Sequence, residues 1–177
     1  MLKPQSLYNL LLAAVPQFAA QPDQLSILVR SGRIVSRLGA TLSFEYAYTV
    51  QLVALDFTAH PDCIIVPIQS WIRANQPDLV DNPDRRDKGF RFEAEYKGTA
   101  VLDLIIELDL TEAVRVVRMP PADPSGATPD PLSTLERWQI THLDEPTPEG
   151  TYPTAEHWEL YDQDTLIATW DRPADRV

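Results

Sequence analysis

Residues 41–57, TLSFEYAYTVQLVALDF, alternate apolar and polar side chains with a period of two. This period places the apolar side chains on one face of a β-sheet and the polar ones on the other. We therefore predict one long strand with a single buried face. That face is built from Leu42, Phe44, Tyr46, Tyr48, Val50 and Leu52, and the opposite face carries Ser43, Glu45, Thr49 and Gln51.

The segment before this strand predicts a β-hairpin. In residues 25–38, LSILVRSGRIVSRL, the dipeptide Ser31–Gly32 suits the two-residue turn of a tight hairpin. Such a turn places the arginines on one face. The other face then carries the apolar side chains of Leu25, Ile27, Val29, Ile34 and Leu38.

A second hairpin is predicted in residues 90–110, FRFEAEYKGTAVLDLIIELDL. A three-residue loop at 97–99, with its glycine at positive φ, sets Phe92 opposite Leu104 and keeps the apolar residues on one face. This register also sets Glu93 opposite Asp103, and directly opposed like charges are destabilising. We therefore expect a basic group near this pair.

Two helices are predicted beside these strands. The first lies between Pro4 and Pro16, and its apolar stripe is Leu7, Leu10, Leu11 and Ala14. An amphipathic helix accounts for these residues better than a signal peptide does. The second follows Pro61, with Pro67 as a site for a kink and a stripe of Ile64, Ile68, Trp71 and Ile72. The order predicts an α+β fold, an antiparallel sheet of four to five strands with two helices on one face.

The composition argues against several classes of function. Hydrophobic residues make up 44% of the chain, which is typical of a globular protein. The net charge of -11 disfavours nonspecific binding to nucleic acid or to anionic lipid, because both rely on Lys and Arg. No window approaches the roughly 20 apolar residues of a membrane-spanning helix. Cys63 is the single cysteine, so an internal disulfide is excluded and synthesis in a reducing cytoplasm is favoured.

Charge divides the chain near residue 118. Residues 1–118 carry a net charge of -2 and residues 119–177 a net charge of -9, and nine of the 16 prolines follow residue 118. We predict a core domain at 1–118 and an extended acidic arm at 119–177, which begins with a proline-rich linker, MPPADPSGATPDPL (119–132). The arm holds Trp138, Trp158 and Trp170, and residues 156–170 predict a short hairpin. These tryptophans are candidate interface anchors.

No catalytic motif stands out. His60, His142 and His157 lie in separate segments without metal-ligand spacing, and no glycine-rich phosphate loop occurs. Ser43, Ser70 and Ser133 lack a nucleophile signature. The second hairpin gathers acidic residues that could hold Mg²⁺, but a solvated or subunit-facing strand surface accounts for them more simply. These are Glu93, Glu95, Asp103, Glu107 and Asp109. We expect no catalytic residue, cofactor or metal.

The loop DRRDKGFR, residues 84–91, concentrates basic side chains. Arg85, Arg86, Lys88 and Arg91 are four of the 15 basic residues of the chain. Charge runs are usually solvated. Arginine also pairs bidentately with carboxylates and is enriched at interfaces, so docking against an acidic partner is the alternative. The residues alone leave both interpretations open.

Four stretches together resemble the tail completion protein R family of temperate contractile-tailed phages and phage-derived bacteriocins. They are MLKPQSL (1–7), LSFEYAYTVQLVALDF (42–57), NPDRRDKGFRFEAE (82–95) and LDLIIELDLTEAV (102–114). The resemblance covers residues 1–117, and the segments 141–146 and 158–170 are less similar. None of the stretches is a chemical motif, and the family brings no catalytic residue to transfer.

The resemblance implies a structural protein at the head-proximal end of a tail, in a terminator or collar position that caps tube or sheath. It implies a ring of identical copies, a hexamer, in contact with tube and sheath proteins. Assembly is then expected in the host bacterial cytoplasm, followed by residence in a virion tail or a bacteriocin particle. In a ring, one surface contacts a different surface of the next copy, which a basic loop and an acidic face on one chain would satisfy. The candidate interface residues are Arg85, Arg86, Lys88, Arg91, Glu93, Asp103, Trp138, Trp158 and Trp170.

Two other functions stay open at this point. A monomeric adaptor would not assemble with itself. A metal-dependent hydrolase on the acidic hairpin would be stabilised by Mg²⁺ or Mn²⁺, because a ligand that binds the native state raises its melting temperature.

Overall fold

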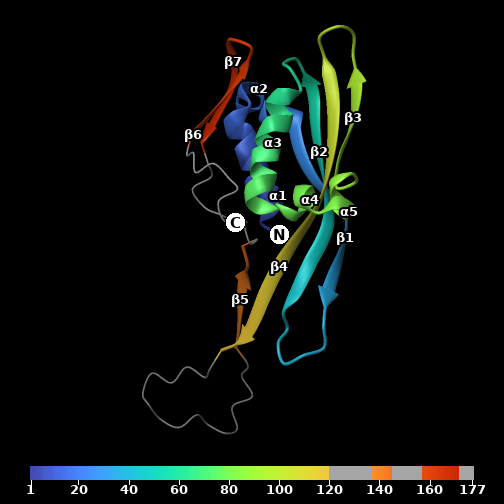
Figure 1. Ribbon diagram of the computed structural model, residues 1–177, viewed down its shortest axis with the longest axis vertical. Helices are drawn as coiled ribbons and strands as arrows, with labels where there is room; N and C mark the ends of the chain where they lie inside the picture. Colours follow the sequence, from blue (N-terminus) through green and yellow to red (C-terminus); the bar gives the residue numbers. More distant parts are fainter. Residues whose placement is uncertain (120–136, 145–156, 172–177) are drawn as a thin grey trace.

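The computed structural model describes residues 1–119, 137–144 and 157–171 (Figure 1). Two long helices and a five-stranded sheet form its main body, and a short hairpin stands beside them. In chain order the elements are α1 (Lys3–Ala14), α2 (Pro16–Ala20), the 3-10 turn η1 (Pro22–Gln24), β1 (Leu25–Ser36), β2 (Phe44–Phe57), α3 (Asp62–Asn75), α4 (Asp78–Asp81), α5 (Pro83–Arg86), β3 (Phe90–Tyr96), β4 (Leu102–Arg118), β5 (Trp138–His142), β6 (His157–Asp162) and β7 (Thr165–Asp171).

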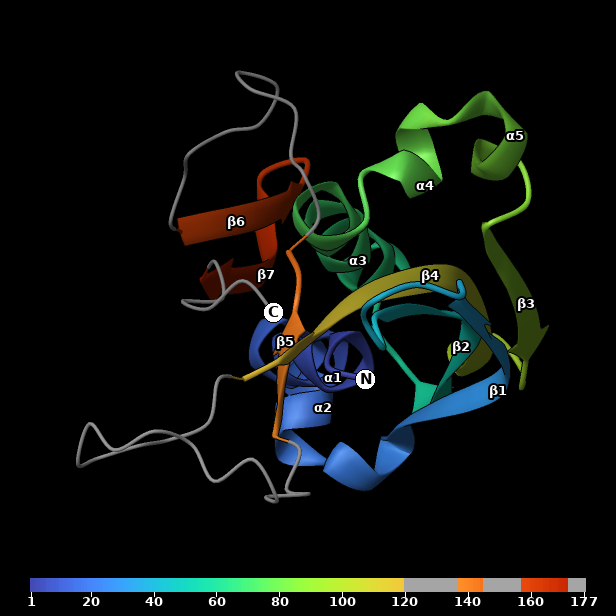
Figure 2. The same ribbon diagram turned by 90° about the horizontal axis from the view of Figure 1, so that it is seen from below.

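The large sheet is antiparallel, with strand order β1-β2-β4-β3 and β5 also paired to β4. Strand β2 pairs with one edge of β4, and both β3 and β5 pair with the other edge. On that edge β3 pairs with residues 102–108 and β5 with residues 114–118. Seen from below, the sheet is strongly twisted and curled, and β1 and β3 are its outermost strands (Figure 2). The predicted α+β fold, with an antiparallel sheet of four to five strands, is confirmed.

Helices α1 and α3 cover one face of the sheet (Figures 1 and 2). The period-two pattern supplies that face, because Tyr48, Val50 and Leu52 of β2 are buried against the helices. The apolar stripes of α1 and α3 form the other side of the core. Each fully buried apolar side chain contributes about 1.5–3 kcal/mol to the free energy of folding. The stripe of α3 runs past Pro67 without ending, and its buried residues are Cys63, Ile64, Pro67, Ile68, Trp71 and Ile72.

The first predicted hairpin is wrong. Residues 25–36 form one strand, β1, paired with β2 along its length, and Ser31–Gly32 is not a turn. Gly32 lies opposite Tyr48, and a Cβ atom at this glycine would lie 3.0 Å from the Tyr48 Cβ. The glycine therefore serves a close approach between strands. A bulge between Val29 and Ser31 adds one residue, which keeps Val29 and Ile34 on the same face.

The second predicted hairpin is correct in its strands and faces, but its register is shifted by two residues. Phe92 pairs with Ile106 instead of Leu104, and Glu95, not Glu93, lies opposite Asp103. The loop is displaced by one position from the predicted 97–99, because the Lys97 N–H donates to the Val101 carbonyl, at 2.8 Å, and residues 98–100 lie between them. Gly98 has the expected positive φ, 90°. The expected basic group is Lys97, whose Nζ lies 2.7 Å from Asp103.

Residues beyond 118 return to the main body. Strand β5 pairs with the end of β4, and the β6–β7 hairpin lies against α1 and α3. Ala168 and Trp170 of β7 are buried in the same cluster as the sheet and helices. The hairpin predicted in 156–170 is confirmed, with Gln163 in its turn at φ 52°. Most of the predicted proline-rich linker, together with Ser133, lies outside the described residues.

The strands extend beyond the helices at the lower end in Figure 1. There several apolar side chains are exposed, among them Ile34 at 66%, Leu42 at 60% and Ile140 at 65%. Within the described residues, every helix is too short or too polar to cross a membrane.

Candidate interaction surface

The outer edge of β4 has a gap of five residues, 109–113, between the end of β3 and the end of β5. Among the residues that the structure describes, no strand pairs with this stretch on that side, and its backbone groups are satisfied by loops and side chains instead. The Asp109 N–H donates to the Gly89 carbonyl at 2.9 Å, and the Leu143 N–H donates to the Ala113 carbonyl at 2.9 Å. Buried backbone groups must find such partners, so this edge is closed.

Gln76 and Lys3 close the middle of the gap. Gln76 follows the end of α3 and is fully buried, and its Oε1 accepts hydrogen bonds from the Thr111 N–H at 3.0 Å and from Lys3 Nζ at 2.8 Å. The ammonium of Lys3 also donates to the Thr111 carbonyl, at 2.7 Å. The Gln76 amide group donates to Asp78 and to Thr111 Oγ1. Both hydrogen-bonding ends of this amide are therefore used.

Glu112 holds the start of the chain against β4. Its carboxylate is buried and accepts the backbone N–H groups of Leu2, at 2.8 Å, and Lys3, at 3.2 Å. The Tyr48 hydroxyl also donates to it. Burial, and then the hydrogen bond to Glu112, raises the pKa of Tyr48 far above its usual range, so this phenol stays protonated and remains a donor. His142 Nδ1 lies 3.4 Å from the same carboxylate.

The basic loop divides into two kinds of residue. Arg85 forms an ion pair with Asp78 and donates to the Asp109 carbonyl at 2.8 Å, so it is part of the closed edge. Arg91 pairs with Glu107 at 2.8 Å and with Asp109 at 3.2 Å. Burial alone would lower the pKa of Arg91, but its two carboxylate partners outweigh burial and raise it.

The other two basic residues of the loop point to solvent. The side chain of Arg86 is 58% exposed, and its nearest carboxylate, Asp87, lies 3.8 Å away. Lys88 is exposed, and its ammonium has no ion-pair partner within the described residues. Arg86, whose contact with Asp87 is long and exposed, and Lys88 are therefore the basic residues of this loop that a partner can reach most easily.

Three residues of the acidic cluster of the second hairpin belong to two ion-pair groups, whereas Glu93 and Glu95 are exposed. Glu107 and Asp109 face Arg91, whereas Asp103 faces Lys97. The hydrogen bond from Lys97 holds the pKa of Asp103 below its usual range, so this carboxylate stays ionised. In the described part of the chain, no group of three or more His, Cys, Asp or Glu residues is placed to hold a metal ion.

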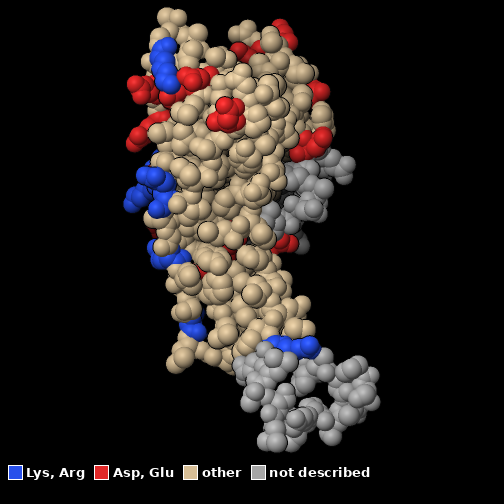
Figure 3. Space-filling model, turned by 180° about the vertical axis from the view of Figure 1, so that it is seen from behind, with Lys and Arg blue, Asp and Glu red and all other residues tan. Residues whose placement is uncertain are grey.

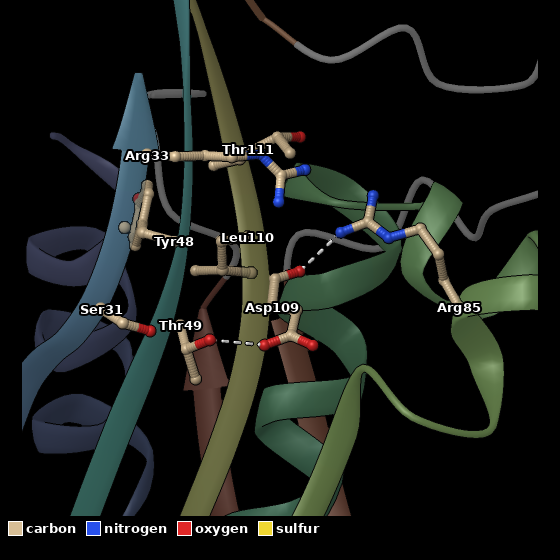
Figure 4. Close-up of a pocket in the computed structure, with 10 residues that line it drawn as sticks. Ser31, Arg33, Tyr48, Thr49, Arg85, Asp109, Leu110 and Thr111 are labelled. Carbon is tan, nitrogen blue, oxygen red and sulfur yellow. Dashed lines mark hydrogen bonds between the residues drawn. The ribbon is translucent and has the colours of Figure 1, made fainter. Parts of the chain in front are cut away.

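A hollow of about 580 Å³ lies on the outer face of the sheet, the face away from the helices. Strands β1, β2 and β4 supply Ser31, Arg33, Thr49, Asp109 and Thr111, and Arg85 closes one side. Thr49 donates to Asp109 at 2.7 Å, and the two guanidinium groups extend over the hollow from opposite sides (Figure 4). Arg33 is exposed and has no ion-pair partner among the residues that the structure describes.

The three tryptophans of the acidic arm lie in two places. Trp158 and Trp170 face each other across the β6–β7 hairpin, with ring centroids 5.8 Å apart and planes 7° from parallel. Trp170 is buried, whereas Trp158 is half-buried. Trp138 begins β5 and pairs with Arg118, on the other side of the molecule from the basic loop. All three therefore contact their own chain.

The side chains considered for catalysis are accounted for by local bonds. Ser70 donates to the Pro67 carbonyl at 2.8 Å, and Ser43 accepts from the Val116 N–H at 3.0 Å. Burial raises the pKa of the Cys63 thiol, which favours the unreactive protonated form. His157 pairs with Asp171 at 2.8 Å on the exposed hairpin, and His60 pairs with Asp62 at 3.2 Å.

Sequence reasoning missed Lys3, Gln76 and Glu112, the buried polar residues that close the edge of β4. Only one of them left a signal. Glu112 occupies a position of β4 where the alternation calls for an apolar residue, between Leu110 and Val114. A charge at an inward position indicates a buried partner, because an unpaired buried carboxylate is costly.

Comparison with known proteins gives one consistent result. A family model described as P2 phage tail completion protein R (GpR) matches residues 1–146. The chain is 36% identical over 171 residues to a protein of Escherichia phage P2 described as tail completion protein R, an alignment that covers 97% of this chain and 99% of that protein. No solved structure matches the chain.

Proposed function

Because the chain belongs to the P2 phage tail completion protein R family, we propose that it caps the head-proximal end of a contractile tail as a ring. The family is one of structural tail completion proteins, and such a role implies contact with other tail components. The observation that carries the proposal is the match along nearly the whole of both chains. The finer parts, which are the ring, its place at the tube or sheath and the contractile tail, go beyond that match.

The geometry supports a ring because the chain offers two different surfaces rather than one self-complementary patch. Strands β1 and β3 end the sheet on opposite sides, and β1 carries arginines whereas β3 carries Glu93 and Glu95. In this view acidic side chains gather toward the upper end, whereas the lowest described part shows basic and uncharged ones (Figure 3). A contact between unlike surfaces repeats until it closes, which generates a ring, and the family resemblance implies six copies.

The protein is proposed to act without catalysis. Glu107, Asp109 and Asp103 are engaged in ion pairs with Arg91 and Lys97, and Ser43 and Ser70 bond to the backbone. Its work is then binding alone, first during assembly in the host bacterial cytoplasm and then in the finished virion tail. A phage-derived bacteriocin particle offers the same position at the end of its tube.

Residues 119–177 are proposed to act as an arm on the core of residues 1–118. The net charge of -9 and the tryptophans support an arm that binds surfaces. Its described parts, β5 and the β6–β7 hairpin, lie against the core of their own chain. Trp158, which is half-buried, is the tryptophan of the hairpin best placed to contact a second protein as well.

The test is to assemble tails in cells that lack the gene for this protein and to view them by electron microscopy. Tubes of irregular length, or tails that fail to join heads, are expected, and the wild-type gene supplied in trans should restore regular tails. Regular and functional tails in its absence would remove the proposed role.

A further inference from the structure

We propose that neighbouring copies join edge to edge, with the free edge of β1 in one copy pairing with the free edge of β3 in the next to form one continuous antiparallel sheet. This inference rests on the proposed ring and names the contact that builds it. It differs from docking by the basic loop, because backbone hydrogen bonds between strands provide the contact.

The edge of β1 is open and long. In the described part of the chain, β1 pairs only with β2, so its other side presents unpaired backbone N–H and C=O groups. Residues 28–36 are exposed, and the apolar side chains of Ile34 and Val35 are 66% and 39% exposed. A long apolar edge of this kind readily pairs with another strand, and proteins usually shorten, charge or cover it. Its exposure therefore indicates a partner.

The edge of β3 is open as well. Within the described residues β3 pairs only with β4, and Phe92 and Tyr96 are 66% and 68% exposed. Glu93 and Glu95 are exposed and form no ion pair in the part of the chain that the structure describes. The strand thus presents apolar and acidic side chains with no internal partner.

The two edges match on both faces of the sheet. Arg33 pairs with Ala47 on the outer face, where Glu93 also lies, because Glu93 is opposite Ile105 and alternates with the inward Phe92. Ile34 pairs with Tyr46 on the helix-facing side, as Phe92 does with Ile106. An antiparallel register with Arg33 opposite Glu93 also sets Ile34 opposite Phe92. One register therefore joins unlike charges outside and apolar side chains inside.

Charge favours this pairing over the pairing of like edges. Residues 25–44 contain three arginines and no acidic residue, whereas β3 carries two glutamates and one arginine. Arg91, that one arginine, is already paired with Glu107 and Asp109. Two β1 edges would oppose arginines, and two β3 edges would oppose glutamates. The hollow beside β1 leaves space for an acidic side chain to reach Arg33.

Strand direction is also consistent with a ring. Strands β2 and β4 lie between the two edges, and each neighbouring pair is antiparallel, so β1 and β3 run in opposite directions within one copy. Rotation about an axis roughly along the strands keeps those directions, and β1 therefore meets the next β3 antiparallel. Residues 25–29 of β1 lie level with β3, and its open part lies further along. The copies are then staggered, as in closed barrels whose strands tilt against the axis.

Cysteine crosslinking tests the contact directly. In a Cys63→Ser background, a chain with Ile34→Cys and Phe92→Cys should form disulfides between copies on oxidation, because opposed residues in paired strands lie within disulfide reach. A ladder ending in one closed species is expected. Each single-cysteine chain should stay uncrosslinked, and so should the matched control with Ile34→Cys and Leu166→Cys, whose second site is 48% exposed on the β6–β7 hairpin. Dimers of the Ile34→Cys chain alone would show like edges meeting and overturn the proposal.

Charge reversal provides a second test with its own rescue. Arg33→Glu, and separately Glu93→Lys with Glu95→Lys, should each weaken self-association about 30-fold or more, because an interfacial charge then meets its like. A mixture of the two variants should regain assembly, because a ring in which the two variants alternate joins unlike charges at every contact. Circular dichroism should show both variants folded. Unchanged association of both variants, measured by sedimentation of the protein and by its content in purified tails, would overturn edge pairing.

The outcomes separate this contact from the ring itself. Closed rings in electron micrographs, with neither crosslinking nor charge dependence, keep the proposed function and reject the edge pairing. Tails that contain only single, uncrosslinked copies of the protein reject both.

Discussion

The outer edge of β4 and the outer edge of β1 both present backbone N–H and C=O groups. Loops and side chains satisfy these groups at β4, whereas those at β1 have no partner strand within the described residues. At β4, residues 109–113 are closed by Gln76, Lys3, Arg85 and the backbone of the loops. At β1, residues 31–36 have no partner on their outer side within the described residues, and Ile34 is largely exposed. A chain that closes one edge so fully and leaves another open indicates that the open edge has a partner elsewhere.

The largest loss of stability is expected where the β6–β7 hairpin of the acidic arm packs into the main hydrophobic cluster. Trp170→Ala should lower the free energy of unfolding by about 4 kcal/mol, because it removes a buried ring that packs in the main cluster and stacks on Trp158. Chemical denaturation measures this. Leu166→Ala, on the same strand but 48% exposed, is the control and should cost less than about 1 kcal/mol. Equal small losses would show that the hairpin does not belong to the folded core.

Next in size is the closed edge itself. Gln76→Ala should destabilise the fold by about 3 kcal/mol, because the Lys3 ammonium and the Thr111 N–H lose a buried acceptor. Gln139→Ala, an exposed glutamine on β5, should change stability by less than about 0.5 kcal/mol. If the two variants unfold at the same denaturant concentration, the polar closure of β4 contributes nothing to stability.

A smaller effect separates the two kinds of arginine in the basic loop. Arg85→Met should lower stability by about 1 kcal/mol, because it removes a partly exposed ion pair and a hydrogen bond to β4. Arg86→Met should leave stability unchanged and instead weaken binding to tail partners if the loop docks. Thermal unfolding and incorporation into tails read out the two effects, and reversed roles would contradict the division.

The smallest effect concerns pH and the arm. The hydrogen bond to Asp171 raises the pKa of His157 above its ordinary value of 6.5. Because the folded value is the higher one, this pair stabilises the hairpin fully below about pH 6.5, and the contribution is lost as the pH rises through the folded pKa. NMR titration of the imidazole should show the raised pKa, and Asp171→Asn should return it toward 6.5. A titration that Asp171→Asn leaves unchanged would refute the pairing.

The sequence predicted the strands of this fold better than their connections. The alternation in residues 41–57 is a local pattern that needs no knowledge of distant residues, and it predicted β2, which spans Phe44–Phe57. Ser31–Gly32 satisfies both a tight turn and a close approach to a neighbouring strand, and only Tyr48 across the sheet decides between them. The register of the second hairpin was two residues off because alternation tolerates any even shift.

The candidate site was less predictable, because side chains distant in sequence build it. Lys3, Gln76 and Thr111 meet only once α1, α3 and β4 are packed together, and no local pattern marks them. The sequence does not distinguish Arg85 from Arg86. In the structure Arg85 donates to the Asp109 carbonyl, on the stretch of β4 that neither β3 nor β5 covers. The family could be recognised from the sequence because the resemblance depends on whole segments and not on single residues.

Edge pairing requires that the open edges of β1 and β3 become covered when the protein takes its place in the tail. Hydrogen–deuterium exchange of the free protein and of the protein in purified tails tests it most directly, because edge amides exchange until a strand covers them. Edge pairing should give residues 30–36 and 90–96 new protection from exchange in the tail, with residues 109–113 protected in both states. Exchange at 30–36 and 90–96 that is equally fast in both states would contradict it.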